Sequence, residues 1–209
     1  NVQIINNISD ASTGGVRLNA SSPIFKNVLI AGNTDQGSGG GLRLLDASHP
    51  ILINTTIVNN TTLVGGGIHF DNIDGYADSY LDAINSIVYQ NSPESIYLYS
   101  DAEPLITYSN IEGEWGWEGE GNIDTDPLFT DPENGDYTLM ENSPCIDSGN
   151  PNLWYEDLDG TVSDMGATGG LFVLPNFTSH DFGEVGDIGS SKQFTLYNFR
   201  ETPITISSI

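Results

Sequence analysis

Four side chains capable of ionic or proton chemistry recur between pairs of apolar residues in the first half of the chain. They are Arg17, Arg43, His69 and Tyr97, and the first three follow one another at steps of 26 residues. In strands of successive coils, such side chains alternate outward and stack about 4.8 Å apart. Because guanidinium groups bind carboxylates at two points, the column predicts a lateral strip for an acidic polysaccharide such as a uronic-acid polymer. The alternative is a solvated face whose charges are balanced by neighbouring acids.

A second candidate is a loop with Asp157, Asp159 and Asp164 around Gly160. Alternating carboxylates and a glycine are typical of calcium loops, so these three acids are candidate calcium ligands. The stretch departs from the EF-hand pattern, which has Glu at the twelfth position where this chain has Thr168. The alternative is a turn in which Asp side chains accept hydrogen bonds from backbone N–H groups.

We assign no catalytic residue. Glycoside hydrolysis needs paired carboxylates, and a lyase needs a base beside the substrate carboxylate. The regular part of the chain offers only Asp10, Asp35 and Asp46, which lie near expected turns and form no doublet. The single cysteine, Cys145, cannot form a disulfide within the chain and is expected to be a small buried residue.

A repeat must position these side chains. The pattern Asn-x-x-Ile/Val-x-x-Asn occurs four times, at steps of 26, 27 and 31 residues, and a period of this size indicates a solenoid. The repeated Asn side chains are expected to form hydrogen-bonded ladders that satisfy the backbone at coil corners. The predicted ladder residues are Asn1, Asn7, Asn27, Asn33, Asn54, Asn60, Asn85 and Asn91.

Glycine pairs keep step with the Asn pattern, at 14–15, 40–41 and 66–67. Each pair precedes alternating apolar residues, which indicates a strand with one buried face. We expect the pairs to provide turn conformations that are closed to residues with a Cβ. Coils of strand and turn that cannot bury their apolar face alone must stack, and a parallel β-helix does this.

On these motifs the chain resembles right-handed, pectate-lyase-like parallel β-helix proteins over residues 1–113. Residues 114–174 resemble the C-terminal capping segment of secreted bacterial β-helix proteins, some of which carry cell-surface anchors. The residues that carry this likeness include Asp126-Pro127-Leu128-Phe129, Ser143-Pro144-Cys145-Ile146-Asp147 and Asp164-Met165-Gly166-Ala167.

Residues 175–209 resemble the opening strands of an abnormal-spindle-like immunoglobulin-like domain, for example at Phe194-Thr195-Leu196-Tyr197-Asn198. A complete sandwich needs about 100 residues, so we expect only part of one. The expected fold is all-β: a right-handed parallel β-helix with a loop-rich acidic C-terminal cap and a partial β-sandwich. Because Asn1 already occupies a ladder position, we expect further coils before it.

The net charge of −24 is concentrated in residues 71–174, which hold 22 carboxylates and no Lys or Arg. Such a segment repels nucleic acid and anionic membrane surfaces, and no apolar stretch is long enough to span a bilayer. High salt or bound calcium would relieve the repulsion, and both indicate an extracellular or cell-surface location.

The sequence therefore favours a structural, stalk or adhesin-like segment of a larger bacterial surface or secreted protein. Its partners would be a polysaccharide or copies of itself. Two alternatives stay open: a polysaccharide lyase or hydrolase with catalytic coils upstream, and a calcium-dependent polysaccharide-binding module.

Overall fold

The computed structural model describes residues 2–71, 78–99, 104–113, 119–157 and 159–170, together with the backbone of 173–175 and 196–198. Residues 1–170 form one compact unit and residues 171–209 a second. The first unit contains a parallel β-solenoid of about four coils. This confirms the expectation of an all-β fold built from stacked coils.

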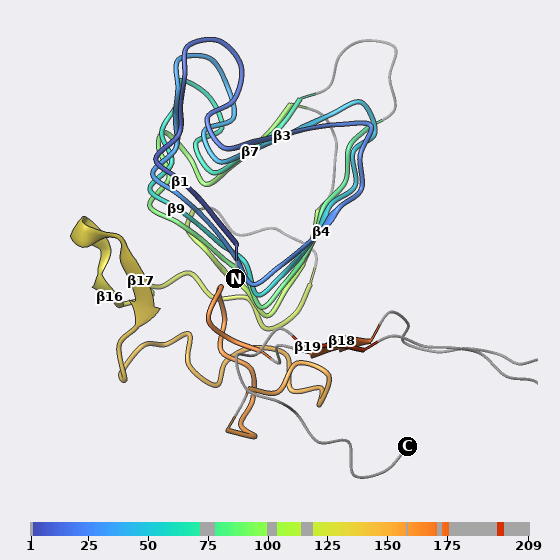
Figure 1. Ribbon diagram of the computed structural model, residues 1–209, viewed down its shortest axis with the longest axis vertical. Helices are drawn as coiled ribbons and strands as arrows, with labels where there is room; N and C mark the ends of the chain where they lie inside the picture. The colour runs from blue at the N-terminus through green and yellow to red at the C-terminus, as the bar shows by residue number, and fades with distance from the viewer. Residues whose placement is uncertain are drawn as a thin grey trace, which may run out of the picture. The chain divides into compact units, whose positions relative to one another are not determined.

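Each coil contributes one strand to each of three parallel sheets, and Figure 1 shows the coils lying one behind another with the sheets as the sides. The first sheet consists of β1 (Val2–Ile5), β5 (Val28–Ala31), β9 (Thr56–Val58), β12 (Ile87–Tyr89) and β15 (Asn110–Ile111). The second sheet consists of β3 (Val16–Asn19), β7 (Leu42–Leu45), β10 (Ile68–Phe70) and β13 (Ile96–Leu98). The third sheet consists of β4 (Ile24–Lys26), β8 (Ile51–Ile53), β11 (Asp82–Ile84) and β14 (Leu105–Thr107). A short pair, β2 (Ile8–Ser9) and β6 (Thr34–Asp35), lies between the first two sheets in the coil.

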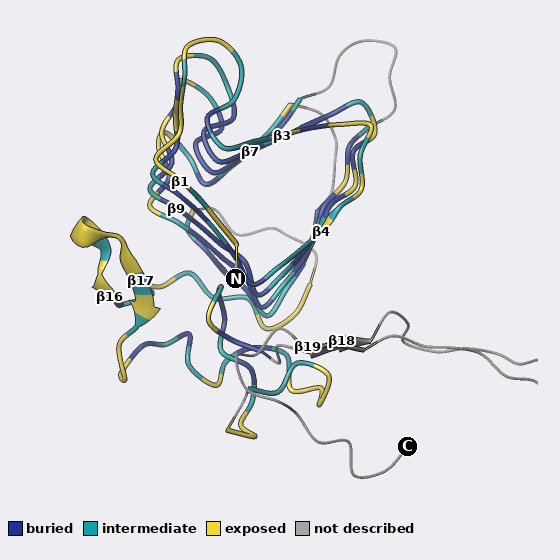
Figure 2. Cartoon of the chain, viewed as in Figure 1, coloured by how far each residue is buried: buried dark blue, intermediate teal, exposed yellow. Residues whose placement is uncertain are grey.

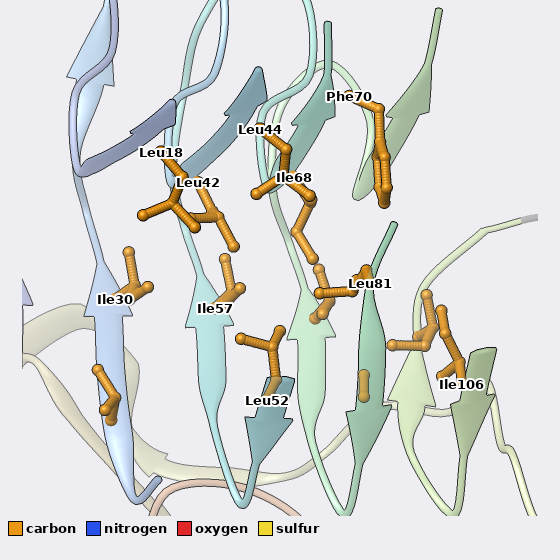
Figure 3. Close-up of a cluster of buried hydrophobic side chains, with 14 residues drawn as sticks. Leu18, Ile30, Leu42, Leu44, Leu52, Ile57, Ile68, Phe70, Leu81 and Ile106 are labelled. Atoms are coloured by element: carbon orange, nitrogen blue, oxygen red, sulfur yellow. The ribbon is translucent and has the colours of Figure 1, made fainter. Parts of the chain in front are cut away.

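The apolar residues of the three sheets meet inside the coils. Strand alternation places one residue in two inward, and the parallel register aligns equivalent residues of successive coils, such as Ile68 with Leu42 and Ile96. Figure 3 shows the resulting columns, which include Leu18, Leu42 and Ile68 from the second sheet. The side chains of Ile30, Leu44 and Ile57 are wholly buried. In Figure 2 strands of the middle coils such as β9 are buried along their whole length, whereas β1 of the first coil is mostly exposed.

The corner between the third and first sheets has a left-handed backbone in every coil. Asn27, Asn54 and Asn85 have φ values of 51°, 46° and 51°, and Tyr108 takes the same place with φ of 47°. Asn tolerates this conformation better than most residues with a Cβ because its short polar side chain bonds locally. The repeated Asn therefore makes the chain turn here at low cost.

The glycine pairs have a different purpose from the one predicted. Left-handed φ values occur at Gly39 and Gly65, one residue before the pairs 40–41 and 66–67, and not within them. The paired glycines lie where neighbouring coils approach most closely: a Cβ on Gly40 would come 2.5 Å from the carbonyl oxygen of Gly66. Close backbone contact between coils, and not an unusual turn conformation, excludes larger residues at the pairs.

The segment after the coils lies along the outer face of the first sheet. A bridge between Asn110 and Ile123 first extends that sheet by one step. The chain then forms a hairpin of β16 (Phe129–Asp131) and β17 (Asp136–Leu139), joined by the short 3-10 helix η1 (Pro132–Asn134). Phe129, Cys145 and Met165 pack with Val58 and Ile87 of the sheet to form a second apolar core.

In the second unit the structure describes only β18 (Val173–Pro175) and β19 (Leu196–Asn198), which pair antiparallel. The expected immunoglobulin-like strands in 175–209 otherwise lie outside the described residues. The division at 113 and 174 stays a prediction.

Candidate functional site

The predicted lateral strip forms one column on the second sheet. Strand pairing aligns Arg17 with Arg43, Arg43 with His69, and His69 with Tyr97. Their exposure differs along the stack: Arg17 is exposed, whereas His69 is 5% exposed. The column therefore offers a far smaller open surface than its sequence pattern indicates.

Arg43 is committed to contacts within the protein. Its guanidinium forms an ion pair with Asp71, with Nε 3.2 Å from Oδ2, and its side chain is only 17% exposed. Its Nη1 also donates to the backbone oxygen of Ser12 at 2.8 Å. Arg17 makes a single longer contact, 3.3 Å from Nη1 to Ser12 Oγ. Only Arg17 keeps most of its donors available for another molecule.

His69 is held in a neutral, structural setting. Its ring stacks on Tyr97 with centroids 5.1 Å apart, and Nδ1 lies 3.3 Å from the oxygen of Val64. Burial lowers the pKa of His69, and nearby Arg43 acts in the same direction, against the smaller opposing influence of Val64, Asp71 and Glu94. A buried neutral imidazole with no open side can neither bind an anion nor exchange protons readily with a substrate.

The second Asn of each repeat forms a continuous ladder inside the coils. Asn7, Asn33 and Asn60 each donate from Nδ2 to Oδ1 of the next Asn, at 2.8, 2.9 and 2.9 Å, and the last acceptor is Asn91. Each backbone N–H donates to the same oxygen at 3.0 Å. The amide of Asn60 also reaches the carbonyl of Ile30 at 3.0 Å. These bonds satisfy the polar backbone that the corner buries.

The first Asn of each repeat does not form such a ladder, which corrects the prediction for Asn27, Asn54 and Asn85. Their left-handed backbone turns the side chains outward, and each holds the C-terminal segment instead. Asn27 Nδ2 donates to the oxygen of Gly169 at 2.7 Å, and Asn54 Nδ2 to the oxygen of Asp164 at 2.8 Å. Asn85 Oδ1 accepts from the backbone N–H of Asn150 at 2.7 Å. We call Asn27, Asn54 and Asn85 the Asn clamp. The fourth predicted residue of this column, Asn1, lies outside the described residues.

The candidate calcium ligands cap backbone groups. Asp157 accepts from the N–H of Asp164 at 2.8 Å and from that of Gly170, and Asp159 accepts from the N–H of Thr161 at 3.0 Å. Asp164 accepts from the N–H of Asp147 at 2.9 Å. In the part of the chain that the structure describes, no group of three or more His, Cys, Asp or Glu is placed to hold a metal ion. The structure thus does not assemble Asp157, Asp159 and Asp164 into a cation site.

Two of these carboxyls are nevertheless perturbed. Burial raises the pKa of Asp164 to about 6, and the adjacent charge of Asp157 adds to the effect. Burial likewise raises the pKa of Asp157, against the lowering effect of its backbone donors. The pair therefore titrates nearer to neutrality than ordinary carboxyls do.

The remaining candidate groups are also structural. Asp35 is buried and accepts from the N–H of Gly37 at 2.7 Å, and Asp10 contacts Gln36. Asn110 donates to the sulfur of buried Cys145 at 3.1 Å, and burial raises the pKa of the thiol. A thiol of this kind is a poor nucleophile.

A cavity of about 460 Å³ lies at the C-terminal end of the coils, beside Asn91, Ile96 and Ile111. Its two carboxylates cap backbone: Glu94 accepts from Gly65 N–H at 2.9 Å and Glu112 from Gln90 N–H at 2.6 Å. Both carboxylates are therefore engaged by backbone donors.

Sequence reasoning missed two hydroxyl ladders. Ser21 N–H donates to Ser48 Oγ at 3.2 Å, and Ser48 N–H to Ser79 Oγ at 3.1 Å. At another corner, Thr55 N–H donates to Ser86 Oγ and Ser86 N–H to Ser109 Oγ. The signal was available for the first ladder, because its serines follow the same steps of 27 and 31 residues as the Asn clamp.

No family model, curated protein or solved structure matches the chain. No helix in the described residues has the length and apolar character needed to cross a membrane.

Proposed function

We propose that this chain is a structural element: a rigid β-solenoid segment of an extracellular stalk, fibre or adhesin-like protein of bacterial type. The observation that carries the proposal is the unbroken Asn ladder from Asn7 to Asn91. It joins four coils through paired side-chain and backbone hydrogen bonds. A polar column that is buried from Asn33 to Asn91 and hydrogen-bonded at every step gives one register and little freedom to bend, as a spacer requires.

The contacts of the potentially reactive side chains support the same structural role. Arg43, His69, Asp157 and Asp164 each bond within the protein and leave little open surface. An active site instead keeps an acid, a base or a cation directed at space that a substrate can enter. The acids that line the cavity at the C-terminal end of the coils, Glu94 and Glu112, likewise accept hydrogen bonds from backbone N–H groups.

The resemblance to right-handed, pectate-lyase-like proteins and the acidic charge of residues 71–174 support the extracellular setting. A surplus of carboxylates is tolerated best where salt or divalent cations screen it. The exposed Arg17 could still contact an acidic polysaccharide. A single free guanidinium does not form a binding strip.

Two measurements test the structural role. Spin labels on Asn19→Cys and Gln90→Cys, exposed positions in the first and fourth coils, should give one narrow distance distribution. Cys145 is buried and should stay unlabelled. A broad or multiple distribution would contradict a rigid spacer.

The second measurement incubates the chain with polygalacturonate and alginate, with and without calcium. We expect neither unsaturated ends absorbing in the ultraviolet nor new reducing ends. Turnover that a matched heat-unfolded sample lacks would refute the non-catalytic role.

A further inference from the structure

The turn of the β16–β17 hairpin carries the only Asn-Gly step in the chain, Asn134-Gly135. Asn134 ends the short helix η1, and Gly135 caps it with a left-handed φ of 84°. Both residues are exposed. Apart from its two chain neighbours, no described residue comes within 4 Å of the position that a Cβ on Gly135 would occupy. The backbone that follows the Asn134 side chain is therefore sterically open.

An asparagine beside an unhindered backbone nitrogen can react with that nitrogen without any reagent except water. The nitrogen of Gly135 attacks Cγ of Asn134, so an N–Cγ bond forms and the Cγ–Nδ2 bond breaks. The amide proton of Gly135 leaves with Nδ2 as ammonia. Water then opens the cyclic imide at either carbonyl carbon and gives aspartate or isoaspartate at position 134. Glycine favours the attack because it has no Cβ to obstruct it.

The Gly135 nitrogen is held only weakly against this reaction. Its N–H makes a single hydrogen bond, to the oxygen of Pro132 at 3.2 Å. Because the turn is exposed to solvent, water can replace this bond at little cost.

The asparagines of the coils are protected from the same reaction. In the interior of the ladder, Asn60 is wholly buried, and both its Oδ1 and its Nδ2 are hydrogen-bonded. A branched Cβ on the next residue restricts the approach of the following nitrogen. The next residue is β-branched after five of the repeat asparagines: Asn7, Asn27, Asn33, Asn54 and Asn60.

From this contrast we propose that Asn134 is a site of spontaneous covalent modification, where conversion of the amide to aspartate or isoaspartate loosens the hairpin. The Nδ2 of Asn134 donates to Asp131 Oδ2 at 2.8 Å. An ionised carboxylate has no proton to donate, so the product places a like charge beside Asp131. Isoaspartate in addition inserts a methylene into the backbone of the turn.

The hairpin transmits this change to its contact with the first sheet. The ring of Tyr137 in β17 packs edge-on against Phe129, with centroids 5.4 Å apart. Its hydroxyl accepts a hydrogen bond from Asn59 Nδ2 at 3.1 Å. A distorted turn therefore weakens the pairing of β16 with β17 first, and the contact of Tyr137 with the coils next. The reaction needs only water, so the inference does not depend on the structural role proposed above.

The test incubates the folded full chain in mildly alkaline buffer, which favours removal of the proton from the attacking nitrogen. Peptide mass spectrometry then follows the conversion of each asparagine with time. We expect Asn134 to convert about tenfold faster or more than Asn33 and Asn60, because the buried ladder must open locally before it can react. Fragmentation that separates aspartate from isoaspartate should detect both products at position 134.

Two variants test the chemistry of the step. Gly135→Ala should slow the conversion of Asn134 because the added Cβ obstructs the attack, and the site has room for that methyl group. Asn134→Gln is the matched control: it keeps a side-chain amide, but the longer side chain does not close the same ring, so position 134 should stay unmodified.

A third variant, Asn134→Asp, supplies the charge of one product. Amide hydrogen exchange in residues 129–139 should be faster in this variant than in Asn134→Gln, while β9 and β12 exchange equally in both. A conversion rate at Asn134 no higher than that of the ladder asparagines, or one that Gly135→Ala leaves unchanged, would overturn the modification site. Equal exchange of the hairpin in the Asn134→Asp and Asn134→Gln variants would overturn its effect on the hairpin.

Discussion

One sequence motif gives two columns of asparagine with different roles: one joins successive coils, and the other holds the C-terminal segment. The column from Asn7 to Asn91 points into the coils and bonds to itself at every step. The Asn clamp points outward and bonds to a segment up to 142 residues away. The clamp residues themselves have left-handed φ, whereas in the ladder the left-handed residue precedes the Asn, as at Asn6 and Asn59. A shift of one residue in the turn decides whether the amide faces the core or the flank.

The largest effect on stability is expected for Asn60→Ala in the ladder. The change removes the acceptor of the buried Asn33 N–H and the Asn60 Nδ2 bonds to Ile30 O and Asn91 Oδ1. We expect a loss of about 3–5 kcal/mol in the free energy of unfolding, measured by denaturant titration. Asn142→Ala, at an exposed position of the C-terminal segment, is the control and should change stability by less than about 0.5 kcal/mol. A loss similar to that of the control would mean that the ladder does not stabilise the stack.

The next largest effect on stability is expected at Asn54 of the Asn clamp. Two substitutions there separate the contribution of the side-chain hydrogen bonds from that of the left-handed backbone. Asn54→Gly keeps the left-handed turn and removes the bonds to Ser163 and Asp164, and we expect it to cost about 1–2 kcal/mol. Asn54→Ala should cost about 1 kcal/mol more because a Cβ is disfavoured at this φ.

Hydrogen exchange should show faster exchange at 163–170 in both Asn54 variants, while β9 and β12 stay protected. If exchange rose equally throughout the coils, the clamp and the ladder would be a single structural unit and not two.

A smaller effect is the pH response of the clamped segment. The folded pKa of Asp164 is raised to about 6, above the ordinary value of 3.8, so the folded state binds more protons between those values. Stability should therefore fall as pH rises from about 4 to 6, by about 1 kcal/mol after allowing for solvent screening. Asp164→Asn should flatten this slope, whereas Asp136→Asn, in the exposed hairpin, should retain it. A carboxyl titration by NMR with a midpoint near 4 would contradict the raised pKa.

The smallest effect is expected at the end of the ladder. Asn7→Ala removes only one side-chain donor to Asn33 from an exposed residue, so the cost should be about 0.5–1 kcal/mol. Comparing it with Asn60→Ala by the same titration measures what burial and the additional hydrogen bonds of an interior ladder position contribute together. Equal losses would show that position in the stack is irrelevant.

Much of the fold could be predicted because it depends on local pattern. The period of the Asn motif and the alternation at Leu42 and Leu44 give coils and strands without any knowledge of distant contacts. The alignment of Arg17, Arg43 and His69 follows from equal spacing alone. The burial of His69 could not be predicted in this way, because it depends on the turn that brings Val64 and Gly65 against its ring.

The repeat, the strand faces and the side-chain chemistry at each corner follow from residue types at fixed intervals, so they can be predicted from the amino-acid sequence. Which asparagines join coils and which hold the C-terminal segment depends on tertiary contacts. The same holds for the acids of that segment, which cap backbone groups. The physical reason is that an amide or a carboxylate bonds whatever donor or acceptor the fold brings within about 3 Å, and that neighbour can be more than a hundred residues away.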